Sequence, residues 1–140
     1  MAFDKLEGEK QQQWMALSDV HATTAGGESR STPGGILRTN AFEDADRHAN
    51  LYQRLSRMNH SCAPNAHRLS TDNRGGVAVV ASQDIVAGEE VLISYMDGAD
   101  GDVPVEERRA RLRQQYHFQC TCALCLKQEK ATLRGGPDPL

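Results

Sequence analysis

Apolar side chains recur at loosely helical intervals near the start of the chain. These positions are Phe3, Leu6, Trp14, Leu17 and Val20, and most residues between them are polar or charged. Apolar residues three or four positions apart line one face of a helix. The pattern therefore predicts a solvent-facing helix, or a pair of helices, over residues 2–22.

Three further stretches lead into the middle of the chain. Residues 23–35 are rich in Gly, Ser and Thr, a composition typical of flexible backbone, and they predict a mobile loop. Residues 36–42 carry a short apolar run that predicts a strand followed by a turn. In residues 46–55 apolar side chains recur at every third position, which predicts a short helix with one buried face.

The clearest strand patterns lie in residues 77–81 and 90–95, where β-branched and other apolar side chains dominate. The connection between them contains Gly88, which can adopt the positive φ that a tight turn requires. We therefore expect these two strands to pair in an antiparallel sheet.

A helix is predicted to begin shortly after this sheet. Asp102 can serve as its N-cap, and Pro104 fits its first turn. Glu106 and Glu107 favour the positive end of the helix dipole. Four arginines follow, which we interpret as a solvated face that pairs partly with these glutamates or contacts an acidic partner. Residues 127–140 show no packing pattern and predict a disordered tail.

Length and charge narrow the classes of function. The chain has 140 residues, which suits one compact domain. Its formal net charge is -3 and its pI is about 5.9, so no overall basic field favours nucleic acid, and a protein or small molecule is the expected partner. No apolar run reaches the ~20 residues that span a bilayer. The first residues also lack a signal-peptide pattern, so we expect a location in the nucleus or cytoplasm and no membrane contact.

Four cysteines are the first chemically informative feature. Three of them, Cys120, Cys122 and Cys125, are crowded into one short segment, and Cys62 is the fourth. In a reducing compartment such cysteines are metal ligands or free thiols more often than disulfides. Zinc binds four thiolates in a tetrahedron, so the count favours one structural zinc ion.

Other interpretations of these residues stay open at the level of sequence. The cysteines can be ordinary thiols, or Cys122 and Cys125 can form a redox Cys-x-x-Cys pair, although the strand-to-helix context of thioredoxin is absent. Cys62 can also be a nucleophile that His60 activates. His60 and His117 are reserve metal ligands.

Three motifs follow one another along the chain. They are Arg-Met-Asn-His-Ser-Cys-Ala-Pro-Asn at 57–65, Gly-Glu-Glu-Val-Leu-Ile-Ser-Tyr at 88–95, and Tyr-His-Phe-Gln-Cys-Thr-Cys-Ala-Leu-Cys at 116–125. In this order and spacing they resemble the SET family of protein-lysine methyltransferases. The Cys-x-Cys-x-x-Cys form of the third motif is most similar to the SMYD-type branch and its fungal relatives. The resemblance runs from about Pro33 to Cys125.

The resemblance implies a mainly β fold with a helical insert, the β-clip fold of SET domains, in which residues 59–65 thread through a pseudoknot. Residues 1–32 then correspond to the insert and its flexible loop, 33–98 to the C-terminal part of the SET core, 99–126 to a helix and the post-SET zinc segment, and 127–140 to the tail. Family members carry a strand pair with a Gly-x-Gly cofactor element upstream of the insert. Because no counterpart of that element is found, we expect an incomplete SET domain.

The activity that the resemblance implies is methyl transfer from S-adenosylmethionine to a lysine of a histone or another protein. The missing Gly-x-Gly element motivates an alternative, in which the chain is a catalytically inactive, zinc-stabilised module that binds other proteins. Both hypotheses retain one structural zinc ion, and both expect a protein partner.

The resemblance also assigns roles to individual residues. Tyr95 matches the active-site tyrosine, whose hydroxyl helps to align the methyl group with the incoming amine. The implied cofactor contacts are Asn40, Asn59, the backbone of His60, Tyr116 and Phe118. The implied zinc ligands are Cys62, Cys120, Cys122 and Cys125. Considered singly, Tyr95 is more often a core tyrosine with a wet hydroxyl, each asparagine is more often a turn former, and Phe118 can simply cover the cysteines. Only the joint match favours the functional roles.

Overall fold

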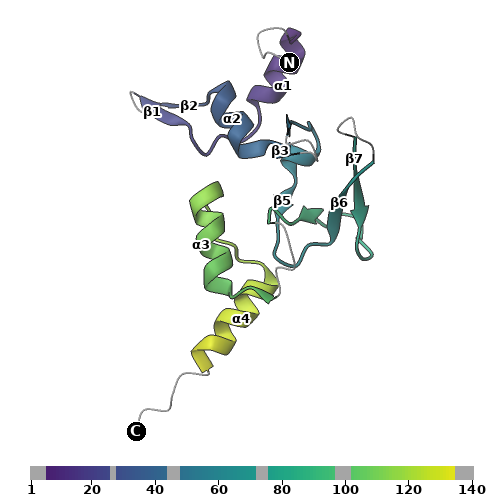
Figure 1. Cartoon of the computed structure of the whole chain (residues 1–140), viewed down its shortest axis with the longest axis vertical. Coiled ribbons are helices and arrows are strands. Elements are labelled where there is room, and N and C mark those ends of the chain that lie inside the picture. The colour runs from purple at the N-terminus through teal and green to yellow at the C-terminus, as the bar shows by residue number, and fades with distance from the viewer. Residues whose placement is uncertain (1–5, 26–27, 44–47, 72–75, 97–101, 135–140) are drawn as a thin grey trace. The chain divides into compact units, whose positions relative to one another are not determined.

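The computed structural model describes the following parts of the chain (Figure 1): residues 6–25, 28–43, 48–71, 76–96 and 102–134. Contacts divide the chain into two compact units, where the length alone suggested one domain. The first unit comprises Met1–Met58 and Leu69–Ala78, and the second comprises Asn59–Arg68 and Val79–Leu140. The chain therefore passes from one unit to the other more than once.

The first unit contains two helices, α1 (Gly8–Met15) and α2 (Pro33–Asn40). Helix α1 confirms a helix near the start of the chain, but it is shorter than the pattern predicted. Helix α2 replaces the strand expected over residues 36–42, so that prediction was wrong. The reason lies at its N-terminus, where the Thr32 hydroxyl accepts the N–H of Gly35 at 3.0 Å and Pro33 occupies the first turn. Both features favour the start of a helix.

The segment between these helices forms a hairpin of β1 (Thr23–Ala25) and β2 (Glu28–Arg30), where the sequence predicted a mobile loop. Thr23 pairs with Arg30 in this antiparallel register. Gly26 and Gly27, which carried much of the loop prediction, lie outside the described residues. Threonine favours extended backbone, and the ladder bonds of the pair hold the described residues in strands.

A second small strand pair joins β3 (Phe42–Glu43) to β4 (Ala49–Asn50), also antiparallel. The helix predicted over residues 46–55 is not observed in the described part of that range, because Ala49 and Asn50 use their backbone groups in this pair. A 3₁₀ turn, η2 (Leu55–Arg57), follows and buries Leu55.

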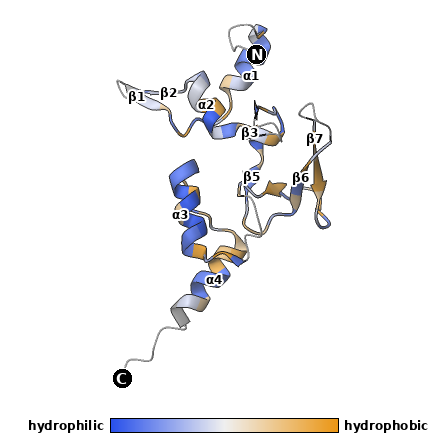
Figure 2. Ribbon diagram, viewed as in Figure 1, coloured by the Kyte–Doolittle hydropathy of each residue, from blue (hydrophilic) through white to orange (hydrophobic). Residues whose placement is uncertain are grey.

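The four remaining strands form two pairs. Strand β5 (Asn59–His60) runs parallel to β8 (Leu92–Ile93), and β6 (Ala66–Ser70) pairs with β7 (Val77–Ala81), which Figure 2 shows as hydrophobic along its length. The strand at 77–81 is confirmed. Its predicted pairing with 90–95 was wrong, because β8 covers only two residues of that range and pairs with β5 instead.

Two helices end the described chain, α3 (Val105–Tyr116) and α4 (Ala123–Arg134). Helix α3 confirms the predicted helix, although Pro104 and not Asp102 takes the N-cap position. Residues 127–134 are helical, so the disordered tail predicted from residue 127 was wrong for this part, and residues 135–140 lie outside the described chain. No described helix is long and apolar enough to cross a bilayer.

The extension of α4 has a physical cause that the sequence pattern did not reveal. Arg109 of α3 binds both carboxylate oxygens of Glu129 at 3.0 and 3.1 Å, and Arg108 donates to Gln128. Side chains of α3 therefore hold the second turn of α4. The buried core of this second unit is the cluster of Cys62, Val105, Leu112, Cys120 and Cys125.

Asp19 generates a prediction for the first unit. Its carboxylate accepts the N–H groups of His21 and Thr32, each at 2.9 Å. A Cβ added at Gly35 would lie 2.3 Å from one of these carboxylate oxygens, whereas one added at Gly34 meets nothing within 4 Å. We expect Gly35→Ala to lower the free energy of unfolding by ~1–3 kcal/mol, because it displaces a bonded carboxylate.

Gly34→Ala is the matched control, and it should be neutral or stabilising by up to ~1 kcal/mol because alanine favours helix. Urea unfolding of the full chain, followed by circular dichroism, measures both changes. Equal stabilities for the two variants would contradict the observed contact.

Candidate metal centre and aromatic cluster

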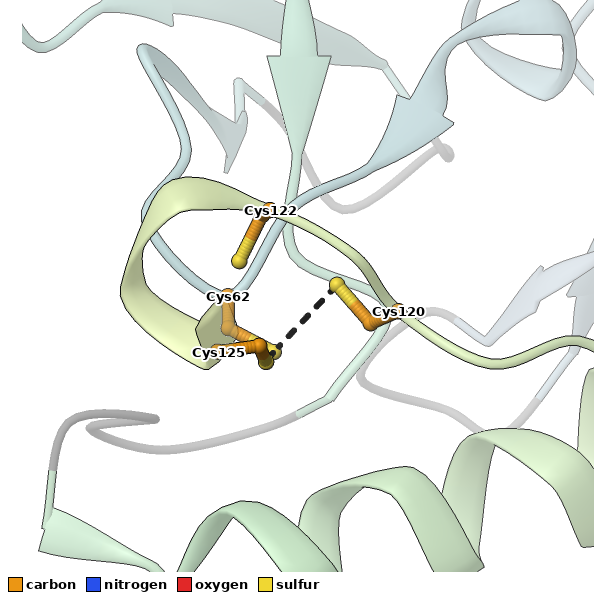
Figure 3. A group of neighbouring side chains, drawn as sticks. All are labelled: Cys62, Cys120, Cys122 and Cys125. Atoms are coloured by element: carbon orange, nitrogen blue, oxygen red, sulfur yellow. Dashed lines mark hydrogen bonds between the residues drawn. The ribbon is translucent and has the colours of Figure 1, made fainter. Parts of the chain in front are cut away.

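The side chains of all four cysteines converge on one point (Figure 3). Cys62 follows β5, Cys120 and Cys122 lie between α3 and α4, and Cys125 lies in the first turn of α4. Cys62, Cys120 and Cys125 are buried and Cys122 is partly exposed. The structure thus brings together every residue that was predicted to bind zinc.

The separations between the sulfur atoms fit a four-thiolate metal site. The Cys62 sulfur lies 3.5 Å from that of Cys125 and 3.8 Å from that of Cys120. All four sulfurs lie within 4.8 Å of one another. Zinc–sulfur bonds of about 2.3 Å in a tetrahedron place sulfurs ~3.8 Å apart. The four-cysteine cluster could therefore hold a zinc ion with little rearrangement.

Burial and hydrogen bonds shift the pKa values of three of these thiols. Burial raises the pKa of Cys62 and that of Cys120. Burial acts to raise the pKa of Cys122, but hydrogen bonds from the backbone of Cys125 and Cys62 and with the side chains of Cys120 and Cys125 together outweigh it and lower this pKa to about 6. A thiolate is thus already favoured at Cys122, whereas Cys62 and Cys120 need a nearby positive charge to lose their protons.

The His60 imidazole connects the cysteines to Tyr95. Its Nδ1 lies 3.0 Å from the backbone nitrogen of Tyr95, and its Nε2 lies 3.3 Å from the sulfur of Cys62. A backbone N–H can only donate, so Nδ1 accepts and the ring proton belongs on Nε2, where it points at the Cys62 sulfur. His60 is therefore a neighbour of the cluster and not one of its four members.

Aromatic rings pack beside the cysteines. The ring of Tyr95 lies 4.8 Å from that of Tyr116 and 5.3 Å from the imidazole of His60, and it meets Phe118 edge to face at 6.4 Å. Tyr95, Tyr116 and Phe118 all pack against the buried cysteine core. The structure thus groups the predicted active-site tyrosine with three of the predicted cofactor contacts. We call these four residues the aromatic cluster.

The hydroxyl of Tyr95 is held in its neutral form. Burial raises its pKa above the ordinary value, with smaller contributions in the same direction from Tyr116 and Glu90. At neutral pH this side chain is therefore a phenol, which can both donate and accept a hydrogen bond.

The asparagines at the two ends of the 59–65 segment behave differently. Asn59 is exposed, and its amide donates to Glu90 at 2.6 Å. Asn65 is buried, donates to the carbonyl of Glu90 at 2.9 Å and accepts the N–H of Leu92 at 2.8 Å. Asn65 therefore fixes the chain just before β8, while Asn59 keeps an accessible amide.

Asn40 belongs to the first unit, where it holds helix α2. Its amide donates to the carbonyls of Ser18 and Ile36 at 2.6 and 2.7 Å. These bonds explain why the side chain is buried. Its role as a cofactor contact stays a prediction.

Arg108 is a residue of this site that the sequence interpretation missed. It was assigned to a solvated face, yet its side chain is fully buried and donates to the sulfur of Cys125 at 3.4 Å. A signal was present, because Val105, Arg108 and Leu112 share one face of α3 by their spacing and all three are buried. An arginine that lies between two apolar residues on the buried face of a helix is expected to be buried as well.

The geometry also weighs on the other interpretations of the cysteines. All four thiols are free, and their sulfurs are too far apart for disulfide bonds. The raised pKa and burial of Cys62 disfavour a nucleophilic thiolate, although His60 lies beside it. A closed set of four converging sulfurs is typical of a structural metal centre.

The chain is similar in sequence to known proteins. The SET domain family model matches residues 4–96 of the chain. Protein-lysine N-trimethyltransferase SMYD5 of Gallus gallus is 42% identical over 78 residues, which cover 56% of this chain and 19% of that protein. Histone-lysine N-methyltransferase SMYD3 of Mus musculus is 41% identical over 80 residues, 57% of this chain and 18% of that protein.

A fungal protein is also similar. Histone-lysine N-methyltransferase SET5 of Yarrowia lipolytica is 33% identical over 81 residues, which cover 58% of this chain and 18% of that protein. The matched stretch therefore spans about a fifth of the length of these relatives.

The bonds of Asn65 generate a prediction for this region. Replacement by alanine leaves the N–H of Leu92 and the carbonyl of Glu90 without their side-chain partner. We expect Asn65→Ala to lower the free energy of unfolding by about 1–3 kcal/mol, since these groups are part of a buried network.

Asn59→Ala is the control, because that amide is exposed and loses one bond, to Glu90. Its cost should stay below ~1 kcal/mol. Chemical unfolding of both variants measures the difference, and an equal loss at the two positions would show that Asn65 is not the anchor.

Proposed function

The chain belongs to the SET domain family, and from this membership we propose that it is part of a protein-lysine methyltransferase that uses S-adenosylmethionine. Short strands with several helices agree with part of a SET fold, as the sequence motifs implied. The similar proteins named as protein-lysine methyltransferases support the class of reaction.

One observation carries the proposal for this chain. The aromatic cluster packs against the four-cysteine centre. Tyr95, the residue expected to orient the reacting groups, is therefore supported by the buried core. Methyl transfer depends on in-line geometry, and a rigid support for Tyr95 serves that need.

The proposed roles follow from the chemistry of the side chains. S-adenosylmethionine supplies an electrophilic methyl group when bound. Tyr95, as a neutral phenol, orients the lysine amine through its hydroxyl. Tyr116 and Phe118 offer flat apolar rings that suit the adenine and the aliphatic lysine stem.

Asn59 and Asn40 complete the proposed cofactor contacts, together with the backbone of His60. The exposed amide of Asn59 can hold the polar amino-acid end of the donor, since an amide presents a hydrogen-bond donor and an acceptor. That amide now donates to Glu90, so binding must exchange or share this partner. The carboxylate of Glu90 would then lie beside the ammonium group, which favours it electrostatically.

We further propose that the four cysteines bind one structural zinc ion in a post-SET segment. Metal–thiolate bonds would tie the loop after β5 to the start of α4, segments far apart in the sequence. Since an unfolded chain has no preformed site, the binding free energy becomes folding free energy. This stabilisation is substantial for a unit whose buried core contains three of the ligands.

The proposed partner is a protein that presents a lysine, either a histone or another protein, in the nucleus or cytoplasm. The similar proteins carry names of both kinds, histone-lysine and protein-lysine methyltransferases. In the proposed division of the chain, residues 33–98 form the SET core and residues 99–126 the zinc-bearing segment.

Methyl transfer is the direct test of the enzyme proposal. We expect the purified chain to bind S-adenosylmethionine in calorimetry and to transfer labelled methyl to a histone mixture. Tyr95→Phe should lower this rate by roughly 10- to 100-fold, because the amine loses its orienting hydroxyl.

Tyr52→Phe is the matched control, since Tyr52 packs against Phe42 in the first unit and has no proposed catalytic role. It should leave the rate unchanged. A folded chain that does not bind the cofactor would remove the enzyme proposal and favour the non-catalytic interaction module.

Metal analysis tests the zinc proposal separately. We expect one zinc ion per chain, with Cys120→Ser abolishing tight binding and lowering the melting temperature because the remaining ligands cannot close a tetrahedron. Thr121→Ser, at an exposed neighbouring position, should retain the metal. A zinc-free chain that melts like the loaded one would refute a structural role for the ion.

A further inference from the structure

Arg108 is a buried cation whose partners in the described chain are unusual. Its side chain has no exposed surface, and it donates to the carbonyl of Val103, to Gln128 at 2.7 Å and to the sulfur of Cys125 at 3.4 Å. Its Nε has no partner within the described residues. None of the three acceptors is a carboxylate.

The neighbouring arginines of α3 differ in this respect. Arg109 binds the carboxylate of Glu129 with two nitrogens, and Arg111 binds that of Glu107. Their charges are therefore balanced by acidic side chains nearby. Arg108 shares the helix and the residue type, but the observed anionic candidates within its reach are the cysteine sulfurs.

A guanidinium buried without an anion is strongly unfavourable, because it loses its hydration and gains no compensating charge. A divalent zinc ion bound by four thiolates carries a formal charge of about -2, which is equally unfavourable in a buried core. The positive charge of the guanidinium and the negative charge of the metal-loaded thiolates therefore offset each other. Their contact lowers the cost of burying both.

We propose that Arg108 is the counter-ion of the four-cysteine centre. Its guanidinium donates an N–H to the Cys125 sulfur and balances part of the negative charge of the metal-loaded thiolates. Arg108 contacts a ligand and not the metal, so it is a positioning residue. The inference rests on the proposed zinc site and adds to it the residue that sets the charge of that site.

The geometry around Arg108 supports a fixed position for the charge. Val103 accepts from one end of the guanidinium, and Gln128 and Cys125 lie three positions apart on α4, so one nitrogen reaches both. Three acceptors around one rigid fork restrict its rotamer freedom. A lysine ammonium, with a single charged nitrogen, could not span the same partners.

Two variants separate the charge of Arg108 from its hydrogen-bond geometry. Arg108→Met removes the charge and keeps an apolar stem, and Arg108→Lys keeps the charge and loses the fork. We expect the methionine variant to bind zinc 10- to 100-fold more weakly in chelator competition, as is usual when a partner of a metal ligand is lost. The lysine variant should fall between it and the unmodified chain.

A spectroscopic measurement distinguishes this role from simple packing. Cobalt in the four-cysteine site gives a sulfur-to-metal charge-transfer band, whose energy depends on the electrostatic potential at the sulfurs. Loss of a nearby cation raises the sulfur electrons in energy, so the band of Arg108→Met should move to lower energy. Leu112→Ala removes packing from the same buried face of α3 and should leave the band in place.

Arg111→Met is the surface control and should change neither the affinity nor the band, since its partner is the exposed Glu107. An Arg108→Met protein that retains the unmodified affinity and band energy would overturn the counter-ion role while leaving the zinc proposal intact. Failure of the unmodified chain to bind zinc or cobalt would overturn both. Should Arg108→Met fail to fold, Arg108→Gln, which also removes the charge but keeps a hydrogen-bond donor, decides the question by the same two measurements.

Discussion

The convergence of Cys62 on Cys120, Cys122 and Cys125 is the constraint on which the second unit depends. The loop after β5 and the segment between α3 and α4 are distant in sequence, and three of these sulfurs form part of the core that Val105 and Leu112 complete. A core this small would gain stability from directional bonds to the proposed metal ion, in addition to the burial of apolar area. The aromatic cluster packs against this core, so the placement of Tyr95 is a consequence of the same convergence.

The sequence could predict this site because its evidence is local or countable. Three cysteines within six residues, one further cysteine in the middle of the chain, and the aromatic residues beside them leave few arrangements that satisfy a tetrahedral metal. The strand at 77–81 and the helix after Pro104 were predictable for a similar reason, since each has a strong periodic or capping signal of its own. The SET resemblance added the roles of Asn59 and Tyr95, which no composition or spacing implies.

The errors have two physical origins, a local helix cap and side chains that bind groups far away in the sequence. Thr32 and Pro33 start a helix over residues whose apolar run resembled a strand. Asn65 binds the backbone of Glu90 and Leu92, so the apolar run that follows gives only a short strand, and β8 finds β5 rather than β7. Residues 127–134 are helical because Arg108 and Arg109 bind side chains of this segment. The first outcome was decided by a local helix cap, and the other two by side chains acting on a distant backbone or carboxylate, which a linear pattern does not contain.

Hydrogen bonds connect the proposed metal centre to the proposed active-site tyrosine. Arg108 donates to the sulfur of Cys125, and the His60 Nε2 proton points at the sulfur of Cys62, so two of the four sulfurs have a hydrogen-bond donor beside them. The other ring nitrogen of His60 accepts the backbone N–H of Tyr95. One imidazole therefore connects a candidate zinc ligand to the backbone that carries Tyr95.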